Sequence, residues 1–205
     1  MTRIKICGLT NEEDAIFCAQ AGADAIGFIL YEKSPRFVEP HQVKSILAKL
    51  PPFVTPVLVF VDPEKNMVAQ ALEAAPHALL QFHGNEPESF CCSFGRPYIK
   101  SFSINEERNL LEYQNSYESA CAFLLDTQVP GKKGGTGVVL PWERLPKSWS
   151  KPLILAGGLN PSNVEEAVAM LKPWAVDVAS GVEATPGKKD FTKIRAFIEA
   201  VRYGN

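Results

Sequence analysis

The chain has 205 residues, of which 46% are hydrophobic and 21% charged, with a formal net charge of −2 and a pI near 6.0. This length and composition are ordinary for a globular protein, and we expect residues 1–205 to form a single domain with a full core. The near-neutral charge provides no general field for nucleic acid or an anionic membrane, so neither is an expected partner, and an anionic ligand must be bound by local geometry.

Two segments bear on targeting and membrane insertion, the first 30 residues and the apolar run 53–61. Its first 30 residues lack the basic start, long apolar run and small-residue cleavage site of a signal peptide. The apolar run 53–61 is too short to span a bilayer and is interrupted by Pro56. We therefore expect a cytoplasmic protein.

The cysteines are odd in number and scattered, which argues against a disulfide framework. They are Cys7, Cys18, Cys91, Cys92 and Cys121. Adjacent Cys91 and Cys92, with His83 nearby in sequence, raise the question of a zinc site. Neighbouring side chains on a short helix point in different directions, however, so no metal is expected.

The first predicted strand ends in a thiol. Ile4 and Ile6 alternate with Lys5 and Cys7, and Gly8 ends the strand before an acidic helical turn. In folds built from parallel strands, chemistry collects at the carboxyl ends of the strands. The alternative is that Cys7 is a small apolar filler, because cysteine is among the most buried residue types.

Strands and helices alternate along the rest of the chain. We predict eight strands, at residues 4–7, 24–30, 53–61, 78–82, 98–102, 122–125, 153–156 and 175–179. We predict helices at 11–21, 40–49, 63–75, 86–93, 105–117, 161–171 and 191–201, with a short helical or irregular connection at 142–149. Eight such units with short connections predict an α/β protein of the (β/α)8 TIM-barrel class, with a doubly wound open sheet as the alternative.

Glycine pairs follow the last two predicted strands. Gly157 and Gly158 come directly after the seventh strand, and Ser180 and Gly181 follow the eighth. Glycine lets backbone N–H groups approach an anion, and barrels commonly bind phosphate at these two positions. The sequence therefore predicts a phosphate-binding cup, although tight turns without a ligand would show the same residues.

Asp126 follows the sixth predicted strand and gains interest when it is considered together with Cys7. Taken alone, such an aspartate often only caps the following turn. Strands one and six lie far apart around an eight-stranded ring, so their end groups can act on a bound ligand from two sides. Cys7 and Asp126 are therefore candidates for a base and an acid in proton movement without a cofactor.

Further candidates follow other strands. Arg36, stiffened by Pro35, is placed to hold a planar carboxylate, unless it is simply exposed. His83 is a candidate ligand-binding residue that could instead only hydrogen-bond its own loop. If Lys5 points into the barrel it needs a partner, and we predict an ion pair with Asp177, which could equally reach ligand hydroxyls.

Taken together, these motifs resemble the phosphoribosylanthranilate isomerase family of tryptophan biosynthesis, over residues 4–190. The matching segments are Lys5-Ile6-Cys7-Gly8-Leu9-Thr10, Gly22-Ala23-Asp24-Ala25-Ile26-Gly27-Phe28, Ser34-Pro35-Arg36, Gln81-Phe82-His83-Gly84, Leu125-Asp126 with Gly134-Gly135-Thr136-Gly137, Ala156-Gly157-Gly158-Leu159-Asn160-Pro161 and Val176-Asp177-Val178-Ala179-Ser180-Gly181-Val182-Glu183.

The resemblance implies an Amadori rearrangement of a phosphosugar, N-(5-phosphoribosyl)anthranilate, with no cofactor. It implies that Asp126 protonates the ribose ring oxygen and that Cys7, as a thiolate, removes the proton from C2. Arg36 would hold the anthranilate carboxylate, and the glycine turns the phosphate. The site would have to favour the thiolate, through nearby helix amides and Lys5. The glycine-rich loop 127–139 would close over the ligand.

Two other readings remain. A lyase or synthase could use the same phosphate cup, but the strand ends near Val61, Phe102 and Ala156 lack the additional ionisable groups that such chemistry wants. A barrel that binds phosphorylated ligands without turnover would not need both Cys7 and Asp126. The sequence leaves a monomer and a homodimer equally open.

Overall fold

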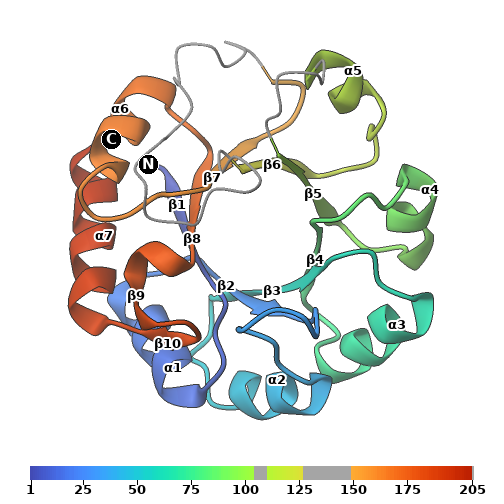
Figure 1. Cartoon of the computed structure of the whole chain (residues 1–205), viewed down its shortest axis with the longest axis horizontal. Helices are drawn as coiled ribbons and strands as arrows, with labels where there is room; N and C mark the ends of the chain where they lie inside the picture. Colours follow the sequence, from blue (N-terminus) through green and yellow to red (C-terminus); the bar gives the residue numbers. More distant parts are fainter. Residues whose placement is uncertain (104–109, 127–148, 205) are drawn as a thin grey trace.

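The computed structural model describes residues 1–103, 110–126 and 149–204, and these form a closed barrel of eight parallel strands inside a ring of helices (Figure 1). The strands are β1 (Arg3–Cys7), β2 (Ala25–Ile29), β3 (Thr55–Phe60), β4 (Leu79–Phe82), β5 (Tyr98–Ser103), β6 (Ala122–Asp126), β7 (Leu153–Ala156) and β8 (Ala175–Val178). Because β1 pairs with both β2 and β8, the sheet closes. The predicted TIM barrel is confirmed, and the open doubly wound sheet is wrong.

The helices follow the predicted order with shifted ends. They are α1 (Glu12–Ala21), α2 (Pro40–Leu47), α3 (Lys65–Ala74), α4 (Glu88–Cys91), α5 (Leu110–Asn115), α6 (Val164–Leu171) and α7 (Phe191–Tyr203). The prediction for α6 began three residues early, because Asn160 and Asn163 close a turn there: the Asn160 amide donates to Oδ1 of Asn163 at 2.8 Å. Residues 105–109 of the fifth predicted helix lie outside the described residues.

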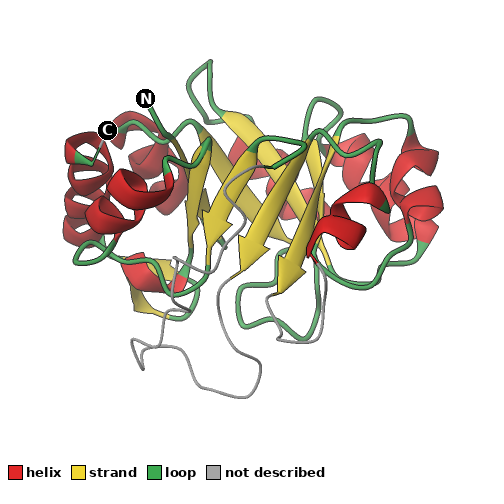
Figure 2. Cartoon of the chain, turned by 90° about the horizontal axis from the view of Figure 1, so that it is seen from above, coloured by secondary structure: helices red, strands yellow, loops and turns green. Residues whose placement is uncertain are grey.

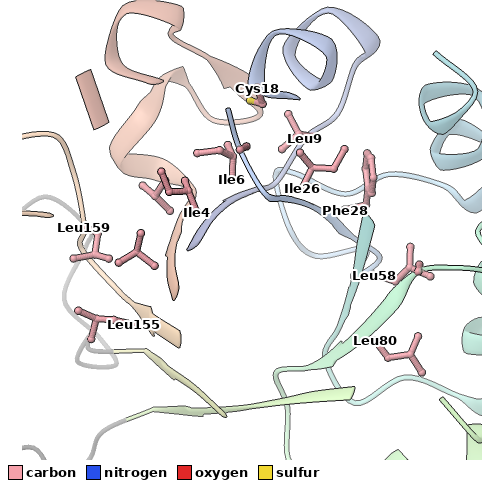
Figure 3. Close-up of a cluster of buried hydrophobic side chains, with 14 of the residues drawn as sticks. Ile4, Ile6, Leu9, Cys18, Ile26, Phe28, Leu58, Leu80, Leu155 and Leu159 are labelled. Carbon is pink, nitrogen blue, oxygen red and sulfur yellow. The ribbon is translucent and has the colours of Figure 1, made fainter. Parts of the chain in front are cut away.

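Alternation along each strand divides the buried residues into two layers. Ile4, Ile6, Phe28, Leu58 and Leu80 point away from the barrel axis toward the helices, as Figure 3 shows. A second cluster fills the barrel interior, with Cys7, Val57, Val59, Leu124 and Ile154 among its members. Each fully buried aliphatic side chain contributes about 1.5–3 kcal/mol of transfer free energy, so both layers stabilise the closed sheet.

The connection from β1 to α1 shows how local sequence sets the strand end. Gly8 has a φ of 76°, a left-handed conformation in which glycine avoids steric strain. The Oδ1 atom of Asn11 then accepts a hydrogen bond from the Asp14 amide at 2.8 Å, capping α1. The chain therefore turns sharply after Cys7 and leaves the thiol at the barrel mouth.

A small hairpin that the sequence analysis did not predict lies at the same end of the barrel. It consists of β9 (Glu183–Thr185) and β10 (Lys188–Lys189), joined by a turn at Gly187. Figure 2 shows this hairpin beside the carboxyl ends of the strands, with both chain termini at the opposite end. The Thr10 hydroxyl donates to the Gly187 carbonyl at 2.6 Å, which ties the hairpin to the loop after β1.

Within the described ranges, none of the helices has the length and apolar character needed to cross a membrane.

Candidate active site

A pocket of about 200 Å³ lies at the carboxyl ends of the strands and is lined by all the residues that the sequence analysis proposed for catalysis or ligand binding. Those residues are Cys7, Arg36, His83, Asp126, Gly157, Gly158, Asp177, Ser180 and Gly181. They come from the ends of six strands, so their convergence depends on barrel closure. The prediction that they form one site is consistent with this geometry, whereas their individual roles remain predictions.

Cys7 is the most buried of the candidate reactive groups. It is 5% exposed, and burial raises the pKa of its thiol, although Lys5 and Lys189 act to lower it. Burial therefore acts against the thiolate in the ligand-free protein, and the expectation that the site favours the thiolate stays a prediction. Lys5 does act in the expected direction, but desolvation outweighs it.

Lys5 and Asp177 form the predicted ion pair inside the barrel. Nζ of Lys5 lies 2.9 Å from Oδ1 of Asp177, and the two side chains are 4% and 10% exposed. Burial acts to lower the pKa of Lys5, but the attraction of Asp177 and Cys7 raises it overall. The Asp177 carboxylate therefore offsets the desolvation of the Lys5 ammonium.

Lys189 is a buried residue of this region that the sequence analysis missed. Its Nζ atom donates to the Cys7 carbonyl at 2.7 Å, to the Ala179 carbonyl at 3.1 Å and to Oε1 of Glu183 at 3.1 Å. One ammonium group thus joins the ends of β1 and β8 to the hairpin. Gly187 before two lysines is a turn signal that could have pointed to the hairpin, but nothing in the sequence connects Lys189 to Cys7.

Arg36 is held differently from the sequence expectation. Its Nε and Nη2 atoms donate to the two carboxylate oxygens of Glu183 at 2.7 and 2.6 Å. This bidentate pair raises the pKa of Arg36, and Arg36 and Lys189 together hold the pKa of Glu183 below its ordinary value despite burial. Glu183 therefore occupies the edge of the guanidinium formed by Nε and Nη2, and the predicted role of Arg36 in holding a ligand carboxylate stays a prediction.

Asp126 lies on a more open wall of the pocket. Its Oδ2 atom is 3.5 Å from Nε2 of His83, and the two side chains are 24% and 29% exposed. Behind them, Nε2 of Gln81 is 3.3 Å from Nδ1 of His83 and 3.3 Å from the Ser101 hydroxyl. In the tautomer that carries its proton on Nε2, His83 directs that proton at the carboxylate of Asp126 and accepts from the Gln81 amide at Nδ1.

The two glycine turns contact each other and form one wall. A Cβ atom on Gly181 would collide with the backbone of Leu159, so the chains approach as only glycine allows. Gly158 has a φ of 68° and open space where a side chain would project. Across the described residues, the N–H groups of Gly158 and Gly181 find no backbone acceptor, which leaves them available to an anion.

In the part of the chain that the structure describes, no three His, Cys, Asp or Glu side chains gather in a way that could hold a metal ion. The five cysteines are free, with Cys91 buried and Cys92 exposed. The predicted closing loop 127–139 and residues 142–148 of the predicted connection lie outside the described residues.

Comparison with known proteins gives a consistent picture. The family model for N-(5'phosphoribosyl)anthranilate (PRA) isomerase matches residues 4–200. A protein from Pseudomonas fluorescens (strain Pf0-1) named N-(5'-phosphoribosyl)anthranilate isomerase is 52% identical over 200 residues, which cover 98% of each chain.

Among solved structures, phosphoribosyl anthranilate isomerase from Thermotoga maritima matches with a TM-score of 0.86 and 40% identity, covering 98% of this chain and 99% of that one. A second structure of such an enzyme, in complex with reduced 1-(o-carboxyphenylamino)-1-deoxyribulose 5-phosphate, matches with a TM-score of 0.82 and 40% identity over the same shares of the two chains.

Proposed function

The chain belongs to the N-(5'-phosphoribosyl)anthranilate isomerase family, and from that premise we propose how its own residues divide the reaction. The protein is an aldose–ketose isomerase of tryptophan biosynthesis, which converts N-(5-phosphoribosyl)anthranilate into 1-(2-carboxyphenylamino)-1-deoxyribulose 5-phosphate. The observation that carries the proposal is one pocket with Cys7 at the end of β1 and Asp126 at the end of β6.

Asp126 is the general acid of the first step. It donates a proton to the ribose ring oxygen as the bond between that oxygen and C1 breaks, and the lone pair of the anthranilate nitrogen forms the C1=N bond. His83, at 3.5 Å, orients the carboxyl group through its Nε2 atom. The partial exposure of this wall suits a group that must regain a proton in each cycle.

Cys7 is the general base of the second step. Its thiolate removes the proton from C2, and the C–H electron pair forms the C1=C2 bond of an enolamine while the iminium nitrogen becomes neutral. Tautomerisation then moves the proton of the C2 hydroxyl to C1, with no net change at the enzyme, and gives the ketone. Cys7 then releases its proton to solvent and Asp126 takes one up, which returns both groups to their starting forms, so we propose that no cofactor takes part.

The remaining pocket residues bind the substrate. The N–H groups of Gly158 and Gly181 approach the phosphate, and the Nη1 edge of Arg36 faces the anthranilate carboxylate while Glu183 holds the opposite edge. Asp177 reaches a sugar hydroxyl with the oxygen that Lys5 leaves free. A single barrel domain over residues 1–205, a cytoplasmic location and closure of the loop 127–139 over the ligand are part of the same proposal.

A fluorescence assay tests these roles. Phosphoribosylanthranilate is generated in place from anthranilate, and its loss is followed for the wild type, Cys7→Ser and Asp126→Asn. We expect rapid loss with the wild type, large drops in both variants, and retained binding of the reduced product analogue by Cys7→Ser. Full activity of either variant would overturn the role assigned to that residue.

The same assay separates the isomerase from a barrel that only binds phosphorylated ligands. Such a barrel would show no turnover with the wild type, and Cys7→Ser would leave its ligand affinity unchanged.

A further inference from the structure

Lys5 is buried beside the proposed base and has no step in the reaction described above. It lies on β1 two residues before Cys7, so that both side chains point into the barrel. Its side chain is 4% exposed, and its Nζ atom is fixed by the 2.9 Å contact with Asp177 on β8. Burying an ammonium group is unfavourable unless its surroundings offset the lost hydration. Asp177 offsets part of this desolvation free energy and also holds the ammonium in place.

Gly27 on β2 leaves the room in which Lys5 and Cys7 approach each other. Gly27 is the register partner of Cys7 across the β1–β2 pair. A Cβ atom built on Gly27 would lie 2.6 Å from Sγ of Cys7 and 3.1 Å from Nζ of Lys5. The thiol and the ammonium therefore both lie next to the space that a side chain at position 27 would occupy.

The charges that face Cys7 come from four elements. Lys5 on β1, Lys189 on β10 and Arg36 after β2 are cationic, and Asp177 on β8 is anionic. Lys5 makes the largest favourable contribution to the thiolate, ahead of the opposing effect of Asp177 and the favourable effect of Lys189. Burial of the thiol acts against all the favourable contributions.

We propose that Lys5 is a positioning residue of the isomerase: its ammonium, anchored by Asp177, is the counter-ion of the Cys7 thiolate, and Gly27 provides the space for that contact. This inference rests on the proposed function, because it matters for turnover only if Cys7 is the base. Lys5 acts through the charge state of Cys7 and touches no reacting atom of the substrate.

The test measures alkylation of Cys7 by iodoacetamide in the ligand-free protein from pH 6.5 to 10, with the modified Cys7 peptide quantified by mass spectrometry. Peptide resolution is needed because Cys92 and Cys121 are exposed. Only the thiolate reacts, so the rate at each pH below the pKa of Cys7 is proportional to the thiolate fraction, and the ratio of two rates reports the difference between two midpoints even where these lie above the measured range. We expect Lys5→Met to move the midpoint upward by about one unit or more, which makes alkylation at pH 8 about tenfold slower.

Two further variants keep the result interpretable. Arg3→Met removes one positive charge from the same strand at an exposed side chain paired with Asp24, and we expect it to leave the profile unchanged. Lys5→Met/Asp177→Asn removes the anion as well, so that no unpaired buried charge remains. Its midpoint should lie between those of the wild type and Lys5→Met, because Lys5 affects Cys7 more than Asp177 does.

Gly27→Ala provides an independent test that retains both charged side chains, Lys5 and Asp177. Its methyl group would crowd Sγ of Cys7 at 2.6 Å and Nζ of Lys5 at 3.1 Å and so separate the two, and we expect the same upward shift and a lower kcat. Unchanged profiles in Lys5→Met and in Gly27→Ala would overturn the inference even if Cys7→Ser is inactive. If Cys7→Ser keeps full turnover, the proposed function fails instead, whatever the alkylation shows.

Discussion

The two reactive walls of the pocket are built in contrasting ways. Cys7 is 5% exposed, its carbonyl accepts a hydrogen bond from Lys189, and Sγ of Cys7 and Nζ of Lys5 both lie next to Gly27. The side chain of Asp126 is 24% exposed and faces His83, whose side chain is 29% exposed. The base side is thus a buried, charge-paired region, and the acid side is partly exposed.

This difference matches the demands of the two steps. A base that removes a proton from carbon gains from a fixed position and from exclusion of water, because a thiolate stripped of hydration is more reactive. An acid that gives its proton to an oxygen gains from rapid exchange with solvent. The comparison predicts that substitutions on the base side affect both stability and rate, whereas substitutions on the acid side affect rate alone.

The largest expected effects come from removing the reactive groups themselves. Cys7→Ser and Asp126→Asn should each lower kcat by about 10²–10⁴-fold, the range typical of a positioned acid or base. Stopped-flow or steady-state fluorescence measures the loss. A fall of less than about tenfold in either variant would show that its group is not the acid or base of the reaction.

Lys189→Met should act on the base side mainly by lowering the free energy of unfolding. It leaves Glu183 with one cation fewer and removes the donor to the carbonyls of Cys7 and Ala179. Breaking a buried pair of this kind costs about 3–5 kcal/mol in the free energy of unfolding, which urea denaturation measures. The matched control is Lys188→Met, one residue earlier on the hairpin and exposed, which should lie within about 0.5 kcal/mol of the wild type.

His83→Asn should show the opposite behaviour on the acid side. The contact between Nε2 of His83 and Oδ2 of Asp126 is long, at 3.5 Å, and both side chains are partly exposed. The free energy of unfolding should therefore change by less than about 1 kcal/mol. We expect kcat to fall by about tenfold because the carboxyl group loses its orienting partner. A large loss of stability with unchanged kcat would contradict the distinction between the two walls.

Low pH should destabilise the folded protein through protonation of Glu183, with a smaller effect than the substitutions above. The pKa of Glu183 is held below the ordinary glutamate value of 4.5, so its charge stabilises the folded state above that pH. This contribution is lost as the pH falls from the ordinary value through the lowered one. Glu183→Gln should therefore lose less stability than the wild type between pH 5 and pH 3, as measured by thermal melts. An equal loss in both proteins would refute the assignment.

Much of the fold and site could be predicted because both depend on local patterns. The alternation of Ile4 and Ile6 with Lys5 and Cys7 gave the strand and its inward face, and the glycine pairs after β7 and β8 marked the turns. The Lys5–Asp177 pair followed from barrel closure, since β1 and β8 must be neighbours.

What could not be predicted depends on contacts between residues distant in sequence and on burial. Lys189 and Cys7 are 182 positions apart, and no period or spacing connects them. The carboxylate of Glu183 takes the Nε and Nη2 donors of Arg36, which the sequence analysis had assigned to a ligand. Burial also acts against the expected thiolate of Cys7, and the sequence does not show this because desolvation depends on the finished packing around the thiol.

The most direct test of the divided site is the kinetic isotope effect of substrate deuterated at C2, measured on kcat for the wild type, Cys7→Ser and Asp126→Asn. If Cys7 removes the C2 proton and Asp126 opens the ring, Cys7→Ser makes proton removal rate-limiting and shows a full primary effect. Asp126→Asn makes ring opening limiting and shows an effect close to one. The same isotope effect in both variants would contradict the assignment of base and acid to opposite walls of the pocket.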